Sequence, residues 1–241
     1  NIAIRSFTNE GDGVIIQQPV YDPFATIVKN DNRKVVNNGL VQVNNEFKMN
    51  LEELEALAAK PENKLMVLCS PHNPVGRVWT KEELTAVAEI CLKHDVILVA
   101  DEIHADIVYE GYKHYPLLSL DKRYEESFIL LTAPSKTFNV AGLKASMSII
   151  PNKELREKFE HTQKTMSLDV RNTFGLECVS AAYTDEGEEW MKQEIAYMQK
   201  NVDFLDKFIE EQMPGAKMIR PQGTFLCWLD LSELHLGDQE L

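Results

Sequence analysis

The sequence has few of the features that mark secreted, membrane-spanning or metal-binding proteins. Its four cysteines are widely separated in a chain of 241 residues and form no C-x-x-C pair, so neither a disulfide framework nor a zinc site is indicated. No apolar run approaches the roughly 18 residues of a membrane-spanning helix, and no secretion signal opens the chain. We therefore expect a cytoplasmic protein with no membrane partner and no metal.

Basic residues are in the minority. The chain has 25 lysines and arginines against 38 aspartates and glutamates, a formal net charge of -13. Such a balance disfavours nucleic acid and anionic lipid as partners, although a small anion can still bind at a local basic spot. Hydrophobic residues make up 44% of the chain, enough for one large core and part of a second domain.

Both ends of the chain have the character of a fragment. Residue 1 is Asn rather than Met, and residues 234–241 open an acidic segment just after an apolar strand. We expect a piece of a longer protein that lacks both ends.

Strand and helix patterns alternate through most of the chain. Short apolar runs predict strands over residues 14–16, 64–69, 96–100, 127–132 and 145–150. Capping-box patterns begin two of the intervening helices, with Glu53 three residues after Asn50 and Glu83 three residues after Thr80. This alternation predicts an α/β fold with three layers, α/β/α, around a mostly parallel sheet.

The pattern changes after Pro151, where long helical stretches replace the alternation. The spacing of apolar residues predicts a helix over 153–166 and another over 174–213, the second broken near Gly187. A long helix of this kind often links two domains.

We divide the chain into two domains on this basis. Residues 1–185 form the large domain, truncated at its N-terminus. Residues 186–241 contain the linking helix and the first part of a small α+β domain, truncated at its C-terminus. Strands of the small domain are predicted over 216–219 and 224–229.

A lysine follows one of the predicted strands. Lys136 stands after the apolar run 128–131, among small and hydroxyl residues. Ligands of open α/β sheets bind at the carboxyl ends of strands, and an amine that is partly removed from water becomes nucleophilic. Lys136 is therefore a candidate nucleophile, although a solvated loop lysine has the same local pattern.

Polar side chains also follow two other predicted strands. Asn73 lies in a proline-rich loop that orients its amide as a hydrogen-bond donor, or that is a plain turn. Asp101 ends an apolar strand, where a carboxylate needs a cation such as a protonated heterocyclic nitrogen, unless it caps a helix or forms a salt bridge. His104 is either a hydrogen-bonding group or an ordinary half-buried histidine.

A second lysine comes eight residues after the first. Lys144, together with a hydroxyl such as that of Ser135, is a candidate clamp for a phosphate group. Taken alone, a lysine in this position is more often a solvated surface charge.

In their order and spacing these motifs resemble a known family. The patterns Asn-Pro-x-Gly from Asn73, Asp-Glu from Asp101 and Ser-Lys-Thr-Phe from Ser135 resemble the fold-type I aminotransferase superfamily, which uses pyridoxal 5′-phosphate (PLP). The longer strings around the first two motifs are most similar to its cystathionine β-lyase branch, the carbon–sulfur lyases of the MalY and PatB type. The resemblance covers essentially the whole chain.

The resemblance implies a role for each candidate residue. Lys136 would bind PLP covalently and carry the substrate α-proton, and Asp101 would pair with the ring nitrogen. Asn73 would donate to the ring 3′-oxygen. Tyr21 matches the aromatic residue that stacks on the ring, although a packed core tyrosine would have the same sequence context.

Ser135 and Lys144 match the phosphate contacts of the family, and His104 joins the cofactor-binding set. Many aminotransferases have Tyr at the position of His104, Ser at that of Ala133 and Arg at that of Lys144. A lysine is a point charge and lacks the two-pronged geometry of a guanidinium. These departures are compatible with the lyase branch and weaken an aspartate-type transaminase assignment.

The activity that the resemblance implies is C–S β-elimination, which cleaves L-cysteine conjugates such as cystathionine to a thiol, ammonia and pyruvate. A class I or II aminotransferase is one alternative, and a regulatory protein that retains the lyase scaffold is another. The family is dimeric, so a homodimer is expected. Its phosphate-binding glycine loop would precede residue 1 and its carboxylate-binding arginine would follow residue 241, so we expect the fragment alone to hold an incomplete site.

Overall fold

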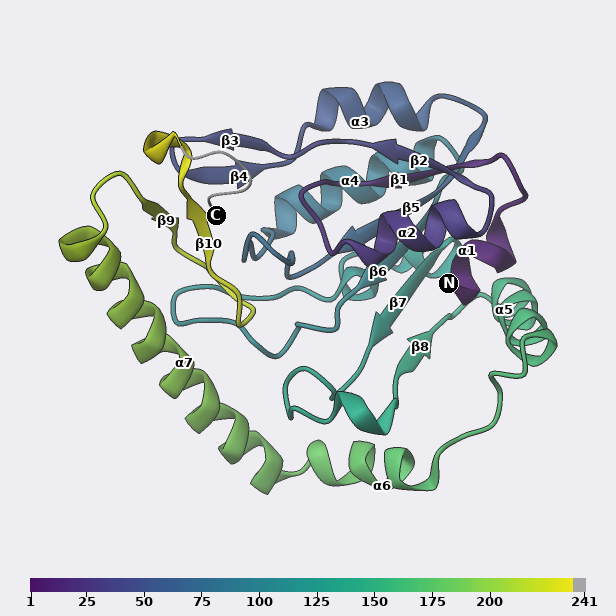
Figure 1. Cartoon of the computed structure of the whole chain (residues 1–241). Coiled ribbons are helices and arrows are strands. Elements are labelled where there is room, and N and C mark those ends of the chain that lie inside the picture. The colour runs from purple at the N-terminus through teal and green to yellow at the C-terminus, as the bar shows by residue number, and fades with distance from the viewer. Residues whose placement is uncertain (236–241) are drawn as a thin grey trace.

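A six-stranded sheet lies at the centre of the structure, a computed structural model that describes residues 1–235 (Figure 1). In spatial order its strands are β2 (Lys34–Asn37), β1 (Gly13–Ile16), β5 (Asn63–Cys69), β6 (Ile97–Asp101), β7 (Phe128–Thr132) and β8 (Met147–Ile149). Neighbouring strands run parallel except β7 and β8, which are antiparallel. The predicted mostly parallel sheet is confirmed.

Both faces of the sheet are buried. In β1, Ile15 packs into the core on one face, whereas Val14 and Ile16 pack into the core on the other. Successive side chains of a strand point to opposite faces, so a strand covered on both sides is apolar at every position. This is why continuous apolar runs identified the central strands.

Helices supply the two outer layers. On one face lie α3 (Leu51–Ala58) and α4 (Lys81–Lys93). On the other lie α1 (Ile2–Phe7), α2 (Pro23–Asn30) and α5 (Lys153–Thr165). The predicted three-layer α/β/α class is therefore confirmed.

The two predicted capping boxes have different outcomes. At α4, the Glu83 N–H donates to the Thr80 hydroxyl at 3.2 Å, and the Thr80 N–H donates to the Glu83 carboxylate at 2.8 Å. At α3, the Glu53 N–H donates to the Asn50 side chain at 3.1 Å, but the Glu53 carboxylate accepts from the Asn38 side chain at 2.9 Å. A tertiary contact has taken the place of the local one.

Several short elements near the N-terminus lack a clear apolar run and were not predicted. They are α1, α2, β2 and the hairpin formed by β3 (Val41–Val43) and β4 (Glu46–Lys48). The side chains of β2 are half-buried or exposed, and those of β3 are exposed. Short strands with this exposure do not produce the pattern of a buried strand.

The long helical stretch is divided into α6 (Thr173–Ala182) and α7 (Asp185–Gln212). The break predicted near Gly187 is confirmed and falls at Tyr183 and Thr184. The Thr184 hydroxyl caps α7 by accepting from the Gly187 N–H at 3.2 Å. A Cβ at position 187 would lie 1.9 Å from the Ala182 carbonyl oxygen. The glycine therefore allows the two helices to approach.

The chain then forms an antiparallel pair of strands, β9 (Lys217–Ile219) and β10 (Trp228–Asp230). The predicted strand over 224–229 begins later than expected, because Thr224 has a φ of 67°, in the left-handed region. Left-handed backbone interrupts the extended conformation of a strand.

The division into domains stays a prediction. Its proposed boundary falls in the first turn of α7, and residues 236–241 of the second part lie outside the described residues. Among residues 1–235, no helix is both long enough and apolar enough to cross a membrane.

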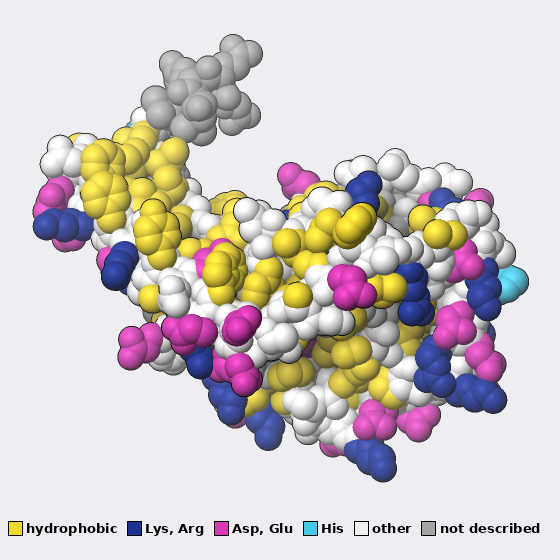
Figure 2. All heavy atoms as spheres, turned by 90° about the horizontal axis from the view of Figure 1, so that it is seen from below, with side chains coloured by type: hydrophobic (Ala, Val, Ile, Leu, Met, Phe, Trp, Pro, Cys, Tyr) yellow, Lys and Arg dark blue, Asp and Glu magenta, His cyan; other side chains and the backbone are white. Residues whose placement is uncertain are grey.

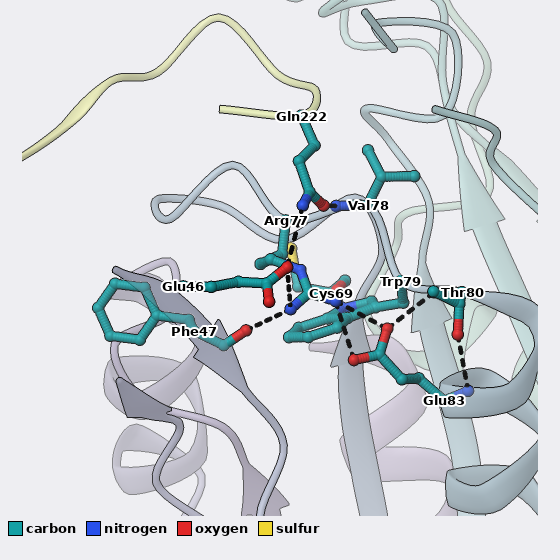
Figure 3. Close-up of polar contacts among 9 residues, drawn as sticks. All are labelled: Glu46, Phe47, Cys69, Arg77, Val78, Trp79, Thr80, Glu83 and Gln222. Atoms are coloured by element: carbon teal, nitrogen blue, oxygen red, sulfur yellow. Dashed lines mark hydrogen bonds and ion pairs between the residues drawn. The ribbon is translucent and has the colours of Figure 1, made fainter. Parts of the chain in front are cut away.

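The buried side chain of Arg77 joins segments that are distant in sequence (Figure 3). Its guanidinium donates to both carboxylate oxygens of Glu83 at 2.8 Å and to the Phe47 carbonyl. It also forms an ion pair with Glu46 at 3.1 Å and lies 4.7 Å from the centre of the Trp79 ring. Arg77 thereby connects the loop after β5 with β4 and α4.

The segment between β9 and β10 docks on the same loop. The Gln222 side chain accepts from the Val78 N–H at 2.9 Å and donates to Glu46 at 3.2 Å. The Gln222 N–H donates to the Gly76 carbonyl at 2.8 Å. Gly76 has a φ of +71°, and a Cβ there would lie 2.6 Å from Pro221, so this close approach requires glycine.

We predict that Arg77→Met lowers the free energy of unfolding by about 2–3 kcal/mol, because Glu83 and the Phe47 carbonyl lose a charged donor. Urea unfolding measures the loss. The matched control is Arg123→Met, since the Arg123 side chain is 58% exposed and pairs with Glu89 at the surface. The control should change stability by less than about 1 kcal/mol. Equal losses in the two variants would contradict the role of Arg77.

Candidate active site

Five of the seven predicted site residues line one pocket at the edge of the sheet where the strands end. The lining consists of Tyr21, Cys69, Asn73, Asp101, Ile103, His104 and Lys136. Cys69 is the last residue of β5 and Asp101 the last of β6. Parallel strands bring their carboxyl ends to a common edge, which is the usual ligand site of such sheets.

Asp101 supplies an acid that is shielded from water. Its Oδ1 accepts a hydrogen bond from the Ile103 N–H at 3.2 Å. Burial raises the pKa of Asp101 to about 6; the hydrogen bond from Ile103 opposes this rise, Glu102 adds to it, and the Lys136 charge also opposes it. A cation bound beside Asp101 would favour its ionised form.

His104 supplies a buried imidazole. It is 1% exposed, and neither ring nitrogen has a hydrogen-bond partner in the described part of the chain. Burial, assisted by the Lys136 charge, lowers the pKa of His104 to about 4, so the ring is neutral at pH 7. A neutral imidazole has one donor and one acceptor nitrogen, so His104 can bind a polar group of a ligand.

Lys136 supplies the amine. It is half-buried in the series of turns that follows β7, and its Nζ lies 5.9 Å from the centre of the Phe225 ring. Its charge lowers the pKa of both Asp101 and His104. Lys136 is thus close enough to Asp101 and to His104 to influence the ionisation of both.

Tyr21 and Asn73 come from separate loops that are hydrogen-bonded to each other. The Tyr21 N–H donates to the Asn73 carbonyl at 3.0 Å, and the Asn73 N–H donates to the Cys69 sulfur at 3.4 Å. The Tyr21 ring meets the Phe24 ring edge-on, with centroids 5.8 Å apart. Tyr21 is 46% exposed, so it is not the packed core residue that the sequence left open.

Ser135 and Lys144 are not among the residues that line the pocket. Ser135 directly precedes Lys136 and is half-buried. Lys144 is exposed, with a φ of 49°, at the end of the 3-10 turn formed by Ala141–Leu143. The contact of Ser135 and Lys144 with a phosphate stays a prediction.

Three residues at the pocket were not predicted from the sequence. Cys69 is the last residue of a predicted strand, and Ile103 lies two residues after Asp101. The rule that ligands bind at strand ends could therefore have found both residues. Phe225 is different, because it comes from the distant segment between β9 and β10 and no local pattern indicates it. The Tyr109 hydroxyl holds that segment by donating to the Thr224 carbonyl at 2.8 Å.

Comparison with known sequences gives consistent matches. Residues 1–241 match the family described as aminotransferase class I and II. Cystathionine beta-lyase PatB of Bacillus subtilis is 39% identical over 241 residues, which are 100% of this chain and 62% of PatB. Protein MalY of Escherichia coli is 34% identical over 239 residues, which are 99% of this chain and 60% of MalY. The predicted resemblance to this branch is confirmed.

A solved structure agrees with this result. The crystal structure of cystalysin from Treponema denticola, which contains a PLP cofactor, matches with a TM-score of 0.95 and 39% sequence identity. The match covers 98% of this chain and 59% of that one. The chain therefore has the expected PLP-dependent transferase fold, and it spans about three fifths of the length of these relatives.

Replacing Asp101 should change how the stability of the ligand-free protein depends on pH. The pKa of Asp101 is about 6 in the fold against an ordinary 3.8, so its ionisation lowers stability as pH rises from about 4 to about 6. Asp101→Asn removes this loss, and its free energy of unfolding relative to wild type should rise by about 2–3 kcal/mol over that window. Urea unfolding at several pH values measures it, and a pH-independent difference would exclude the burial of the charge.

Replacing the buried histidine should have the opposite pH dependence. The pKa of His104 is about 4 in the fold against an ordinary 6.5, so the wild type loses stability as pH falls from about 6.5 to about 4. His104→Gln cannot be protonated, and its stability relative to wild type should increase by about 2–3 kcal/mol as pH falls through this window. The same urea series tests it; a gain that appears on raising the pH would show that this sign is wrong.

Proposed function

The chain belongs to the aminotransferase class I and II family. On this basis we propose that the protein is a PLP-dependent enzyme that acts on an amino acid. The reaction that we propose is β-elimination from an L-cysteine conjugate such as cystathionine, with a thiol, ammonia and pyruvate as products. One observation carries the proposal. An amine, Lys136, and an acid, Asp101, both half-buried, line the same pocket as Tyr21 and Asn73.

The residues of the pocket fit PLP. A protonated pyridine nitrogen would stabilise the ionised form of Asp101, whose pKa is raised to about 6 chiefly by burial. Both ring nitrogens of His104 are without a hydrogen-bond partner among residues 1–235 and could bind polar groups, and Asn73 offers an amide. The half-exposed ring of Tyr21 offers an aromatic face.

When bound, PLP supplies an electron sink that stabilises negative charge at the substrate α-carbon. Lys136 would hold the cofactor and then receive the α-proton on its amine, as an amine partly shielded from water can do. Asp101 would keep the ring nitrogen protonated through its negative charge. The elimination breaks the Cα–H and Cβ–S bonds and forms a double bond between Cα and Cβ. Lys136 would receive the α-proton, and the sulfur would leave with both electrons of the Cβ–S bond and take up a proton to become the thiol. One water would then hydrolyse the remaining enamine to pyruvate and ammonia.

Transamination is the second candidate, because the family is described by that reaction. It also starts with removal of the α-proton, so Lys136 and Asp101 would serve it in the same way. The cystathionine β-lyase relatives favour elimination. A regulatory protein that retains the lyase scaffold is the third candidate, and the presence of Lys136, Asp101 and Asn73 together favours an enzyme over it.

We propose further that the protein is a homodimer in the cytoplasm and that its substrate is a small molecule. Large apolar side chains are exposed on α6 and α7, among them Phe174, Tyr197 and Phe204. Figure 2, which views the molecule from the side of these helices, shows hydrophobic patches across that face. A second copy of the chain would shield such patches from water. The four cysteines are free, as is usual in a reducing compartment.

The test is turnover by the protein expressed from its complete gene. We expect L-cystathionine and PLP to give pyruvate and thiol with the wild type. Lys136→Ala should lower the rate at least about 10²-fold and abolish the absorbance band of lysine-bound PLP, because the base and the covalent anchor are both removed. The matched control is Lys153→Ala, on the exposed surface of α5, which should retain both.

The other results separate the alternatives. A band that survives Lys136→Ala would exclude Lys136 as the anchor. Keto-acid-dependent amino transfer faster than elimination would favour the aminotransferase. PLP bound without any turnover would overturn the lyase and favour the regulatory protein.

A further inference from the structure

The Asp106 carboxylate, which lies outside the pocket, is hydrogen-bonded to the loop that carries Lys136. Thr137, the next residue, is completely buried, and its hydroxyl donates to the Asp106 carboxylate at 2.8 Å. Asp106 belongs to the segment after β6, which also carries Asp101 and His104. The bond therefore joins the two segments whose ionisable groups meet in the pocket.

The Asp106 end of this bond is held by the backbone around it. The Ile107 N–H donates to the His104 carbonyl at 3.0 Å, and the Val108 N–H donates to the Asp106 carbonyl at 3.2 Å. Ile107 is buried, and Val108 forms an isolated β-bridge with Gly223. Asp106 is thus a fixed point to which a neighbouring loop can be attached.

The Lys136 loop has a second attachment beside the first. The Phe138 ring packs edge-on against Tyr183, with centroids 5.9 Å apart, and stacks on Trp190 at 5.6 Å. Burial and the nearby Asp106 charge raise the pKa of Tyr183 to about 12. Asp106 therefore lies where the Lys136 loop, the segment after β6 and the junction of α6 with α7 meet.

Hydrogen bonds inside the loop set its shape but not its place. The Phe138 N–H donates to the Pro134 carbonyl at 2.9 Å, and the Val140 N–H donates to the Ser135 carbonyl at 3.0 Å. Neither bond reaches the segment after β6. The Thr137 hydroxyl does, and a displacement of about 1 Å in a reacting group costs on the order of 10²-fold in rate.

We propose that Asp106 is a positioning residue for Lys136. Through the hydroxyl of Thr137 it holds the Lys136 amine where a single ligand meets both that amine and Asp101. The inference rests on the proposed function, because that function makes Lys136 the covalent anchor of the cofactor.

The experiment uses PLP as the probe and compares two kinds of substitution. Asp106→Ala and Thr137→Val break the bond, whereas Asp106→Asn keeps an acceptor oxygen and Thr137→Ser keeps the hydroxyl. Absorbance gives the total PLP bound. Borohydride, which makes the lysine–cofactor bond irreversible, followed by mass spectrometry gives the share of that PLP attached to Lys136.

We expect Asp106→Ala and Thr137→Val each to lower the ratio of attached to unattached PLP about tenfold, with the conservative variants near wild type. Because the two side chains share one bond, the double variant should be no worse than either single variant. Glu110→Gln removes an exposed carboxylate four residues along the chain from Asp106 and should match the wild type.

Unchanged attachment in Asp106→Ala and Thr137→Val would overturn the inference and leave the proposed function standing. A wild type that binds PLP but never attaches it to Lys136 would instead overturn the proposed function. If Asp106→Ala does not fold, Thr137→Val and Thr137→Ser decide the matter, because equal attachment in these two would also overturn the inference.

Discussion

The pairing of the buried Arg77 guanidinium is the interaction on which the loops at the edge of the sheet depend. A guanidinium removed from water must be paired, and here Arg77, in the loop after β5, finds its partners in β4 and α4. The loop that Arg77 holds in this way also carries Asn73 and contacts the segment before Phe225 through Gly76 and Gln222. Arg77 is therefore linked to two segments that border the pocket, the loop that carries Asn73 and the segment that carries Phe225.

Within the pocket the fold holds two ionisable side chains, Asp101 and His104, in surroundings that disfavour their charged forms. Burial favours the protonated form of Asp101 and the neutral form of His104, and these effects have opposite dependence on pH. Perturbed groups of this kind are concentrated at functional sites because a bound ligand supplies the missing partners. A cationic ring nitrogen beside Asp101 and a polar substituent beside His104 would do so here.

The pocket also depends on contacts between segments that are far apart along the chain. Thr137 reaches Asp106, and the Tyr109 hydroxyl reaches the Thr224 carbonyl, so the loops after β6 and β7 and the segment before β10 are tied to one another. Each link is a hydrogen bond with at least one buried partner, which makes it costly to leave unmade. Cofactor attachment at Lys136 would therefore be sensitive to residues that never touch the cofactor.

The sequence by itself determined the buried strands, the capped start of α4 and the polar residues at strand ends, including Asn73, Asp101 and Lys136. These follow from local spacing, and parallel strands necessarily bring such ends to one edge. Only the tertiary structure decided that Phe225 borders the pocket and that Asn38 takes the Glu53 carboxylate from its capping box. Those outcomes depend on competition between distant partners for the same groups, which no local pattern contains.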